Sequence, residues 1–257
     1  MKVKHLVGAF LCVLGCYACS SPKTEVQSPD GHIKMTLTVD ENGKPFYNVS
    51  VDDSLLIENS AMGFTAANGI ILAEGFQVKN TTFSSEDETW TQPWGENKKN
   101  RNHYNEMAVS LTNEDQVQLT LRFRVFDDGI GFRYEYTVPT VDSLLITDEL
   151  TTFRFHRDGT SWSIPASAET YELLYQQQPI SEVETANTPF TFKTADGVYG
   201  SIHEAALYDF PEMTLKQIGH YTLKAELAPW PDGIKVRKGN HFTTSWPVSY
   251  THLTLPT

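Results

Sequence analysis

The chain has 257 residues, 40% of them hydrophobic and 20% charged, which is typical of a folded globular protein and excludes an intrinsically disordered chain. This length fits one large all-β domain or two small ones. The formal net charge of −12 is spread along the sequence without blocks, so nucleic acid and an anionic membrane surface are disfavoured as partners.

The first 19 residues have the pattern of a secretory signal. Lys2 and Lys4 precede an apolar run at residues 6–14, which is too short to span a membrane stably. All three cysteines, Cys12, Cys16 and Cys19, fall inside this segment. We therefore expect export without a disulfide framework in the mature domain.

The end of the apolar run resembles the lipobox of bacterial lipoproteins, because Ala18 and Cys19 are followed by two serines. Cys19 is the predicted lipidation site, Cys16 is the second choice, and residues 20–27 form a polar linker. This pattern predicts a lipid-anchored protein of the periplasm or outer membrane of a Gram-negative bacterium. Ordinary cleavage to an unanchored periplasmic protein is the alternative.

Alternating apolar residues predict β-strands from end to end. Residues 33–39 and 47–51 alternate around a turn at Asn42 and Gly43, which predicts a β-hairpin. A second alternation at residues 117–125 turns through 127–129 into 132–136, and a further strand is expected at 221–227. There is no long 3.6-residue period and no internal repeat, so the pattern predicts a twisted antiparallel sandwich.

Residues 87–107, DETWTQPWGENKKNRNHYNEM, combine aromatic rings with many side-chain donors and acceptors. Such a block is costly to bury without partners, and loops on a rigid scaffold commonly carry binding groups. We interpret it as a loop that shapes a binding site. A loop that satisfies its own amides is the open alternative.

Four segments of residues 28–246 resemble glycoside hydrolase family 97 and occur in family order. They are SPDGHIKMTLTVDENGKPFYNV near the start, DETW…PWGE…RNHYNE, LRFRVFDDGIGFRYEY at 121–136 and SIHEAAL at 201–207. Members of that family are bacterial α-glucosidases and α-galactosidases. The resemblance implies an antiparallel β-supersandwich of the galactose mutarotase type, which in the family precedes a catalytic (β/α)8 barrel and a small β-domain.

The resemblance also implies that the catalytic carboxylates lie in the barrel, so we expect this chain alone to be inactive. Residues 247–257, PVSYTHLTLPT, depart from the family pattern. We interpret them as an aberrant tail from a truncated or mis-assembled reading frame. A genuine short paralogue that kept only the sandwich is the alternative.

Glu172 is the predicted metal ligand. Residues 163–175 align with the family segment whose glutamate helps to hold an active-site calcium, and Glu169 is the competing position. Calcium takes six to eight oxygen ligands, and the resemblance places most of them in the barrel. We therefore expect calcium in the longer protein and weak or no binding by this chain alone.

Six residues of the 87–107 block are predicted to face carbohydrate, because amides and charged groups bond vicinal hydroxyls and tryptophan stacks on a sugar ring. They are Trp94, Arg101, Asn102, His103, Asn105 and Glu106. The same residues fit a seam to the barrel, which is the interpretation we favour. Arg122, Arg124 and Arg133 are expected on a solvent face or paired with Asp127, Asp128 or Glu135.

These observations predict the N-terminal domain of an exported calcium-dependent α-glycosidase, acting on α-glucosides or α-galactosides, which shapes the active site. The alternative is a non-catalytic carbohydrate-binding surface lipoprotein that uses Trp90, Trp94 and the polar block. A third possibility, an aldose mutarotase, would need an imidazole such as His203. Since adjacent strand residues point to opposite faces, His203 and Glu204 cannot both face one site.

Overall fold

The computed structural model describes residues 24–167 and 169–252. The predicted signal segment with Cys16 and Cys19, and residues 253–257, lie outside the described part. Within it, strands account for nearly all regular structure, and every strand pair is antiparallel. The prediction of an all-β antiparallel fold is confirmed. None of the described residues forms a helix long and apolar enough to cross a membrane.

The first sheet has four strands in sequence order. They are β1 (Glu25–Gln27), β2 (Ile33–Val39), β3 (Pro45–Val51) and β4 (Ser54–Ala61). Strands β2 and β3 form the predicted hairpin, with Ile33 opposite Val51 and Val39 opposite Pro45. The period-two pattern predicted this hairpin because one face of it is buried.

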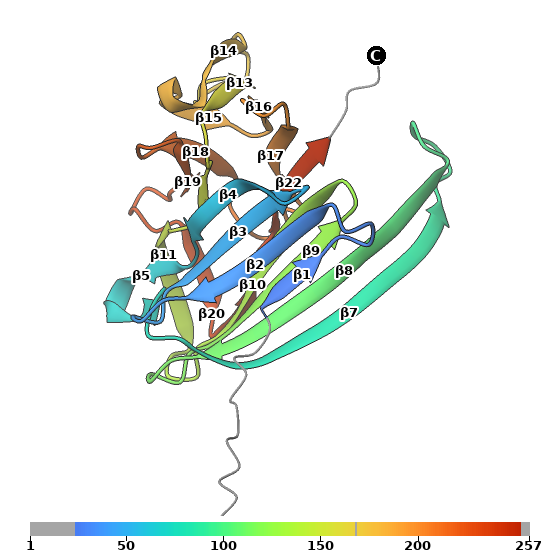
Figure 1. Cartoon of the computed structure of the whole chain (residues 1–257). Coiled ribbons are helices and arrows are strands. Elements are labelled where there is room, and N and C mark those ends of the chain that lie inside the picture. The colour runs from blue at the N-terminus through green and yellow to red at the C-terminus, as the bar shows by residue number, and fades with distance from the viewer. Residues whose placement is uncertain (1–23, 168, 253–257) are drawn as a thin grey trace, which may run out of the picture.

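The second sheet has ten strands and is the largest of the sheets in the described structure (Figure 1). Its order is β14-β13-β16-β17-β22-β10-β9-β8-β7, with β21 also paired to β10. The strands are β7 (Gln77–Thr91), β8 (Lys99–Thr112), β9 (Gln118–Phe126), β10 (Gly129–Thr137), β13 (Gly159–Ser163), β14 (Gln176–Pro179), β16 (Phe190–Thr194), β17 (Tyr199–Ala205), β21 (His241–Thr243) and β22 (Trp246–His252). The backbone of β22 thus continues past residue 246 and joins β17 to β10.

Two further four-stranded sheets complete the described fold. One has the order β20-β11-β5-β6, and the other has the order β12-β19-β18-β15. Their strands are β5 (Phe64–Ala66), β6 (Ile71–Leu72), β11 (Ser143–Glu149), β12 (Thr152–Arg154), β15 (Thr185–Asn187), β18 (Met213–Gln217), β19 (Thr222–Leu227) and β20 (Val236–Gly239); the 3₁₀ turns are η1 (Ala67–Gly69) and η2 (Ile180–Glu182). The strand expected at 221–227 is therefore confirmed from residue 222 onward.

One continuous core joins all four sheets, and part of it lies between the first sheet and the large sheet, whose strands β8 to β10 run behind β1 to β3 (Figure 1). Buried aromatic rings cross this interface: the centroids of Tyr47 on β3 and Phe132 on β10 are 5.3 Å apart. Phe64 on β5 meets Tyr134 on β10 at 4.9 Å in an edge-to-face contact. Such pairs add a geometric preference to the burial of apolar area.

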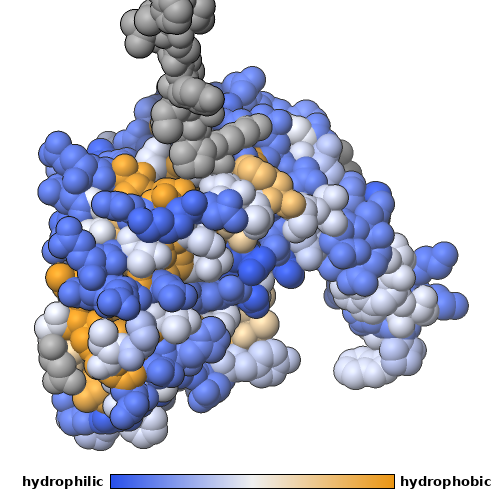
Figure 2. All heavy atoms as spheres, turned by 90° about the horizontal axis from the view of Figure 1, so that it is seen from below, coloured by the Kyte–Doolittle hydropathy of each residue, from blue (hydrophilic) through white to orange (hydrophobic). Residues whose placement is uncertain are grey.

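The block at residues 87–107 is not a loop, and that prediction was wrong. Strands β7 and β8 pair from Gln77–Thr112 to Thr91–Lys99, so only residues 92–98 form the tip. From Phe83 onward almost all of β7 is exposed. The outer part of this ribbon, residues 83–91 and 99–103, has no fully buried side chain, so no apolar alternation marks it as strand, whereas β8 is largely buried from Tyr104 onward. Figure 2 shows it as a largely hydrophilic arm, separated from the body by a hollow.

Glu149, at the end of β11, is a buried carboxyl, 3% exposed. Thr151 Oγ1 donates to Glu149 Oε1 at 2.6 Å, and Tyr134 Oη lies 2.7 Å from Thr151 Oγ1. The Gly63 N–H donates to the Tyr134 hydroxyl at 3.2 Å. Burial raises the pKa of Glu149 to about 7, and the hydrogen bond from Thr151 only partly opposes this.

Gly43→Ala should destabilise the domain far more than Gly31→Ala. Both glycines have positive φ, 74° and 82°. A Cβ at Gly43 would lie 2.3 Å from the Phe76 backbone nitrogen, whereas a Cβ at Gly31 meets nothing within 4 Å. Left-handed strain alone costs about 1–2 kcal/mol, so we expect about that loss for Gly31→Ala and at least ~3 kcal/mol for Gly43→Ala. Urea unfolding measures both, and equal losses would contradict the packing argument.

Glu149→Gln should stabilise the domain at alkaline pH. The folded state keeps a proton on Glu149 that the unfolded chain loses near its ordinary pKa of 4.5, so native stability falls as pH rises from there to about 7. This difference corresponds to about 3 kcal/mol. Urea unfolding should therefore show a gain for Glu149→Gln of that order at pH 8, shrinking toward pH 4.5. The exposed Glu41→Gln is the control; a pH-independent gain would contradict the assignment.

Candidate functional site

Residues 164–167 and 169–175 belong to the loop between β13 and β14, at one edge of the large sheet, and residues 171–175 are exposed. It carries Glu172, which is exposed, followed by three uncovered apolar side chains: Leu173 at 40%, Leu174 at 88% and Tyr175 at 67% exposure. Monomeric surfaces seldom gather large apolar groups in one run without a partner. The loop therefore has the character of a surface that another structure covers.

Glu172 brings one carboxylate to this loop. Its backbone N–H donates to Thr170 Oγ1 at 3.0 Å, and the N–H of the competing Glu169 donates to Ser167 Oγ at 3.2 Å. Across residues 24–167 and 169–252 no cluster of three or more His, Cys, Asp or Glu could hold a metal ion. Glu172 therefore offers a single carboxylate, and the described residues alone do not supply the six to eight oxygen ligands of a calcium site.

A chain of polar contacts ties the loop to the body. The hydroxyl of Tyr171 donates to the carboxylate of Glu212. Glu204 on β17 accepts from the Met213 N–H at 2.8 Å, and burial raises the pKa of Glu204 to about 6. The neighbouring His203 donates from Nδ1 to the carbonyl of Glu204 at 3.0 Å. Through these contacts the body of the domain fixes the position of Tyr171 and of the start of β18.

The residues predicted from the polar block lie on the β7–β8 hairpin, at the opposite edge of the sheet from Glu172. Trp94 lies at the tip and is 85% exposed. Arg101 donates to both oxygens of Asp87 at 2.7 and 2.8 Å, which lowers the pKa of Asp87. Asn102 donates to Glu88 at 3.0 Å, and His103 Nδ1 lies 3.6 Å from Asp127. The structure therefore does not bring Glu172 and these residues into one site.

Asn105 and Glu106 are brought together at a cleft of about 690 Å³ between the start of the domain and β7–β8. Asn105 Nδ2 donates to the Gln27 carbonyl at 2.9 Å. Glu106 is only 8% exposed and is held through both oxygens by arginines. The Asn105 side-chain nitrogen and both Glu106 carboxylate oxygens thus already have partners within the domain.

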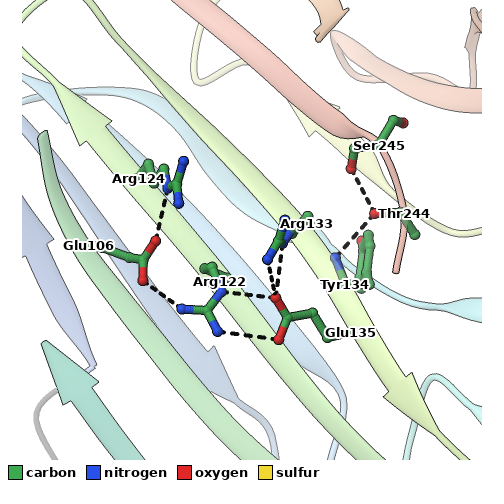
Figure 3. Close-up of polar contacts among 8 residues, drawn as sticks. All are labelled: Glu106, Arg122, Arg124, Arg133, Tyr134, Glu135, Thr244 and Ser245. Carbon is green, nitrogen blue, oxygen red and sulfur yellow. Dashed lines mark hydrogen bonds and ion pairs between the residues drawn. The ribbon is translucent and has the colours of Figure 1, made fainter. Parts of the chain in front are cut away.

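Five residues on β8, β9 and β10 form an arginine–glutamate cluster: Glu106, Arg122, Arg124, Arg133 and Glu135 (Figure 3). Arg122 bridges both acids, with Nη1 2.5 Å from Glu106 and Nε 2.9 Å from Glu135. Arg133 pairs with Glu135 at 2.6 Å. The expected pairing with Glu135 is confirmed. These arginines do not pair with Asp127 or Asp128 in the described structure, and the principal partner that sequence reasoning missed is Glu106.

The cluster is partly buried and is capped by Trp246. Burial by itself would raise the pKa of Glu106, but hydrogen bonds from Arg124 and Arg122 outweigh it and lower the pKa. The guanidinium carbons of Arg124 and Arg133 lie 4.6 and 4.7 Å from the Trp246 ring centroid. With every acid held by arginine, the cluster stiffens the sheet and offers no free general acid or base.

Sequence reasoning missed Asn187, whose side-chain amide is buried without a hydrogen-bond partner among the described residues. It ends the short strand β15 and follows no pattern that separates it from a surface asparagine. Only the three-dimensional burial of its amide distinguishes it.

Residues 26–250 match the family model described as glycosyl-hydrolase 97 N-terminal. A retaining α-galactosidase of Bacteroides thetaiotaomicron is 25% identical over 246 residues, which are 89% of this chain and 36% of that enzyme. The chain therefore spans about a third of the length of this relative.

Solved structures agree. A glycoside hydrolase family 97 enzyme from Pseudoalteromonas sp. strain K8 superposes with a TM-score of 0.86 at 36% identity, covering 90% of this chain and 36% of that one. That enzyme has been solved with acarbose and, as a variant, with panose. A β-arabinopyranosidase, with a TM-score of 0.80 at 20% identity, covering 89% of this chain and 40% of that one, shows the shared fold alone.

The resemblance inferred from the sequence motifs is thereby confirmed. The match over residues 26–250 shows that the chain belongs to the glycosyl-hydrolase 97 N-terminal family.

Proposed function

We propose that the chain is the N-terminal domain of an exported, calcium-dependent α-glycosidase that acts on α-glucosides or α-galactosides. Its part is to shape the active site and to supply Glu172 as one calcium ligand, while the catalytic carboxyl groups lie in a barrel of the same polypeptide. The observation that carries this proposal is the loop at 164–175, which presents one carboxylate beside Leu173, Leu174 and Tyr175, all uncovered.

The chemistry of the loop supports this division of labour. Calcium prefers several hard oxygen ligands, and a carboxylate on an exposed loop can reach a site completed by another domain. When the apolar neighbours are covered, water is excluded and the attraction between carboxylate and cation strengthens. The named relatives support the substrate class: one is a retaining α-galactosidase, and the other was solved with acarbose and panose.

The alternative is a non-catalytic carbohydrate-binding surface lipoprotein. The exposure of Trp94 at 85% and Trp90 at 48% on the hairpin favours it, since exposed tryptophan faces can stack on sugars. Against it, the neighbouring Arg101 and Asn102 are already bound to Asp87 and Glu88. This alternative function requires neither a catalytic barrel nor calcium.

The leading proposal is tested with a chimera in which residues 24–252 replace the matched part of the Pseudoalteromonas enzyme. The chimera should hydrolyse nitrophenyl α-glucoside or α-galactoside in calcium, and the 257-residue chain should not. Glu172→Gln removes a charged ligand, so half-maximal activity should need at least about tenfold more calcium.

Glu169→Gln is the matched control in the chimera and should leave the calcium requirement unchanged. The opposite ranking of the two variants would transfer the ligand role to Glu169. Hydrolysis by the 257-residue chain would contradict the proposal that the catalytic carboxyl groups lie in the barrel.

Export and anchoring belong to the same proposal and rest on the segment around Cys19. Radiolabelled palmitate should enter the protein when it is expressed in a Gram-negative host, because the lipobox cysteine is the acylated residue. Cys19→Ser should abolish labelling and Cys16→Ser should not. Labelling that persists in Cys19→Ser and disappears in Cys16→Ser would move the processing site; no labelling of the unaltered chain would exclude the anchor.

A further inference from the structure

Strand β7 is an open edge of the ten-stranded sheet. Among residues 24–167 and 169–252 it pairs with β8 alone, and Figure 1 shows it as the outermost strand of the sheet. It has 15 residues, whereas strands commonly have roughly five or six. A long uncovered edge presents a row of backbone donors and acceptors with which another strand can pair.

The hydrogen bonds of the β7–β8 hairpin show which backbone groups face outward. The Gln92 N–H donates to the Lys98 carbonyl at 3.0 Å, and in an antiparallel ladder hydrogen-bonded pairs alternate with non-bonded ones. The register stays constant from this end of the hairpin to Asn80, so the even-numbered residues of β7 bond to β8. The odd-numbered residues of β8 bond to β9 instead, as the 3.2 Å contact from the Asn113 N–H to the Val117 carbonyl shows. The N–H and C=O groups of the odd-numbered residues of β7 from 81 to 91 therefore point away from the sheet.

The side chains of β7 leave this edge accessible. Every residue from 82 to 91 is exposed, and the ring of Phe83 is 52% exposed. Natural edge strands often exclude partners with proline or with several lysines. Strand β7 has no proline and one lysine, Lys79, which lies at the bulge between Val78 and Asn80. A partner strand must therefore be compatible mainly with the acids at 86–88.

The charges along β7 are self-complementary. Lys79 lies near one end of the strand, and Glu86, Asp87 and Glu88 lie near the other. Two copies of β7 paired in parallel would set acids against acids, whereas antiparallel pairing about a two-fold axis sets each end against the opposite end. Because the outward groups belong to odd-numbered residues, odd positions must pair with odd positions. Among the registers that this allows, the one that sets Phe83 opposite Phe83 of the second copy also sets Lys79 opposite an acid, Asp87.

This register also suits the neutral part of the strand. It sets two exposed Phe83 rings on the same face of the joined sheet, and aromatic pairs directly across two strands are favourable. The outward backbone groups of Thr81, Phe83 and Ser85 gain partners. Asp87 can keep its bonds to Arg101 at 2.7 and 2.8 Å, since a carboxylate has further lone pairs that can accept from a lysine.

We infer that β7 is the interface of a two-fold dimer, in which two copies of this chain pair antiparallel through their β7 strands and continue the large sheet across both. The self-complementary charge pattern identifies the partner as a second copy. The loop that carries Glu172 lies at the other edge of the sheet, so the inference goes beyond the proposed function and does not rest on it.

Sedimentation equilibrium of the 257-residue chain over a concentration series tests the association and should show a monomer–dimer equilibrium. Amide exchange measured by NMR along the same series tests the surface. The outward N–H groups of Thr81, Phe83 and Ser85 should become protected as the dimer forms, whereas those of Thr82 and Ser84 should be protected at every concentration. A chain that stays monomeric, or a dimer whose outward amides exchange as fast as those of the monomer, overturns the inference.

Ser85→Pro removes one outward donor and leaves the bonds to β8 intact, because proline is tolerated where an edge N–H faces solvent. It should raise the dissociation constant of the dimer at least about tenfold, since the change acts twice across the two-fold axis. The melting temperature of the dilute monomer should stay the same. Ser85→Ala keeps the N–H and is the matched control, which should dimerise as the unaltered chain does. Normal dimerisation of Ser85→Pro would overturn the edge pairing.

Lys79→Glu tests the charge pattern at an exposed position, independently of any effect of proline on folding. It sets an acid opposite Asp87 in both copies and should also weaken the dimer at least about tenfold, whereas Lys79→Arg should not. Normal dimerisation of Lys79→Glu would overturn the register and the choice of a second copy as partner. Loss of association in Leu174→Glu alone would overturn the inference as well, because the apolar loop would then be the contact.

Discussion

The packing of the sheets depends on which side chains strand β10 presents to the core and which it presents to its outer face. Its inward side chains, Phe132, Tyr134 and Tyr136, are almost fully buried and contact aromatic rings from the first and third sheets. Its outward side chains, Arg133 and Glu135, belong to the arginine–glutamate cluster. A shift of one residue in the register of β10 would exchange these faces and bury two charges, so packing and electrostatics fix the same register.

A few polar contacts connect the buried face of β10 to the 164–175 loop. The hydroxyl of Tyr134 connects to Thr151 and thence to Glu149, and the negative charge of Glu204 adds to the factors that keep Glu149 protonated. Glu204 in turn holds the start of β18, and Glu212 just before that strand holds Tyr171. Tyr171 of the 164–175 loop is thus held by a residue next to β18, and the core fixes the position of that strand.

Sequence reasoning succeeded where a buried face imposes a period and failed where it does not. The β2–β3 and β9–β10 hairpins alternate because one side packs in the core, so their strands and turns could be predicted. The outer part of the β7–β8 hairpin, residues 83–91 and 99–103, has no fully buried side chain, and its strand pairing left no apolar signal. Glu172 could be singled out through resemblance alone, while Asn187 needed the burial and the empty bonding positions of its amide to be seen.

The proposed role of the loop explains why large apolar side chains are exposed on it. An exposed Leu174 beside an exposed Glu172 stabilises neither an isolated domain nor a solvated turn. Both become favourable if a second domain covers the leucine and supplies a cation to the carboxylate, because burial strengthens the ion contact and removes apolar area from water. Association of the two domains would therefore satisfy the carboxylate and the apolar side chains together, which ties metal binding to domain association.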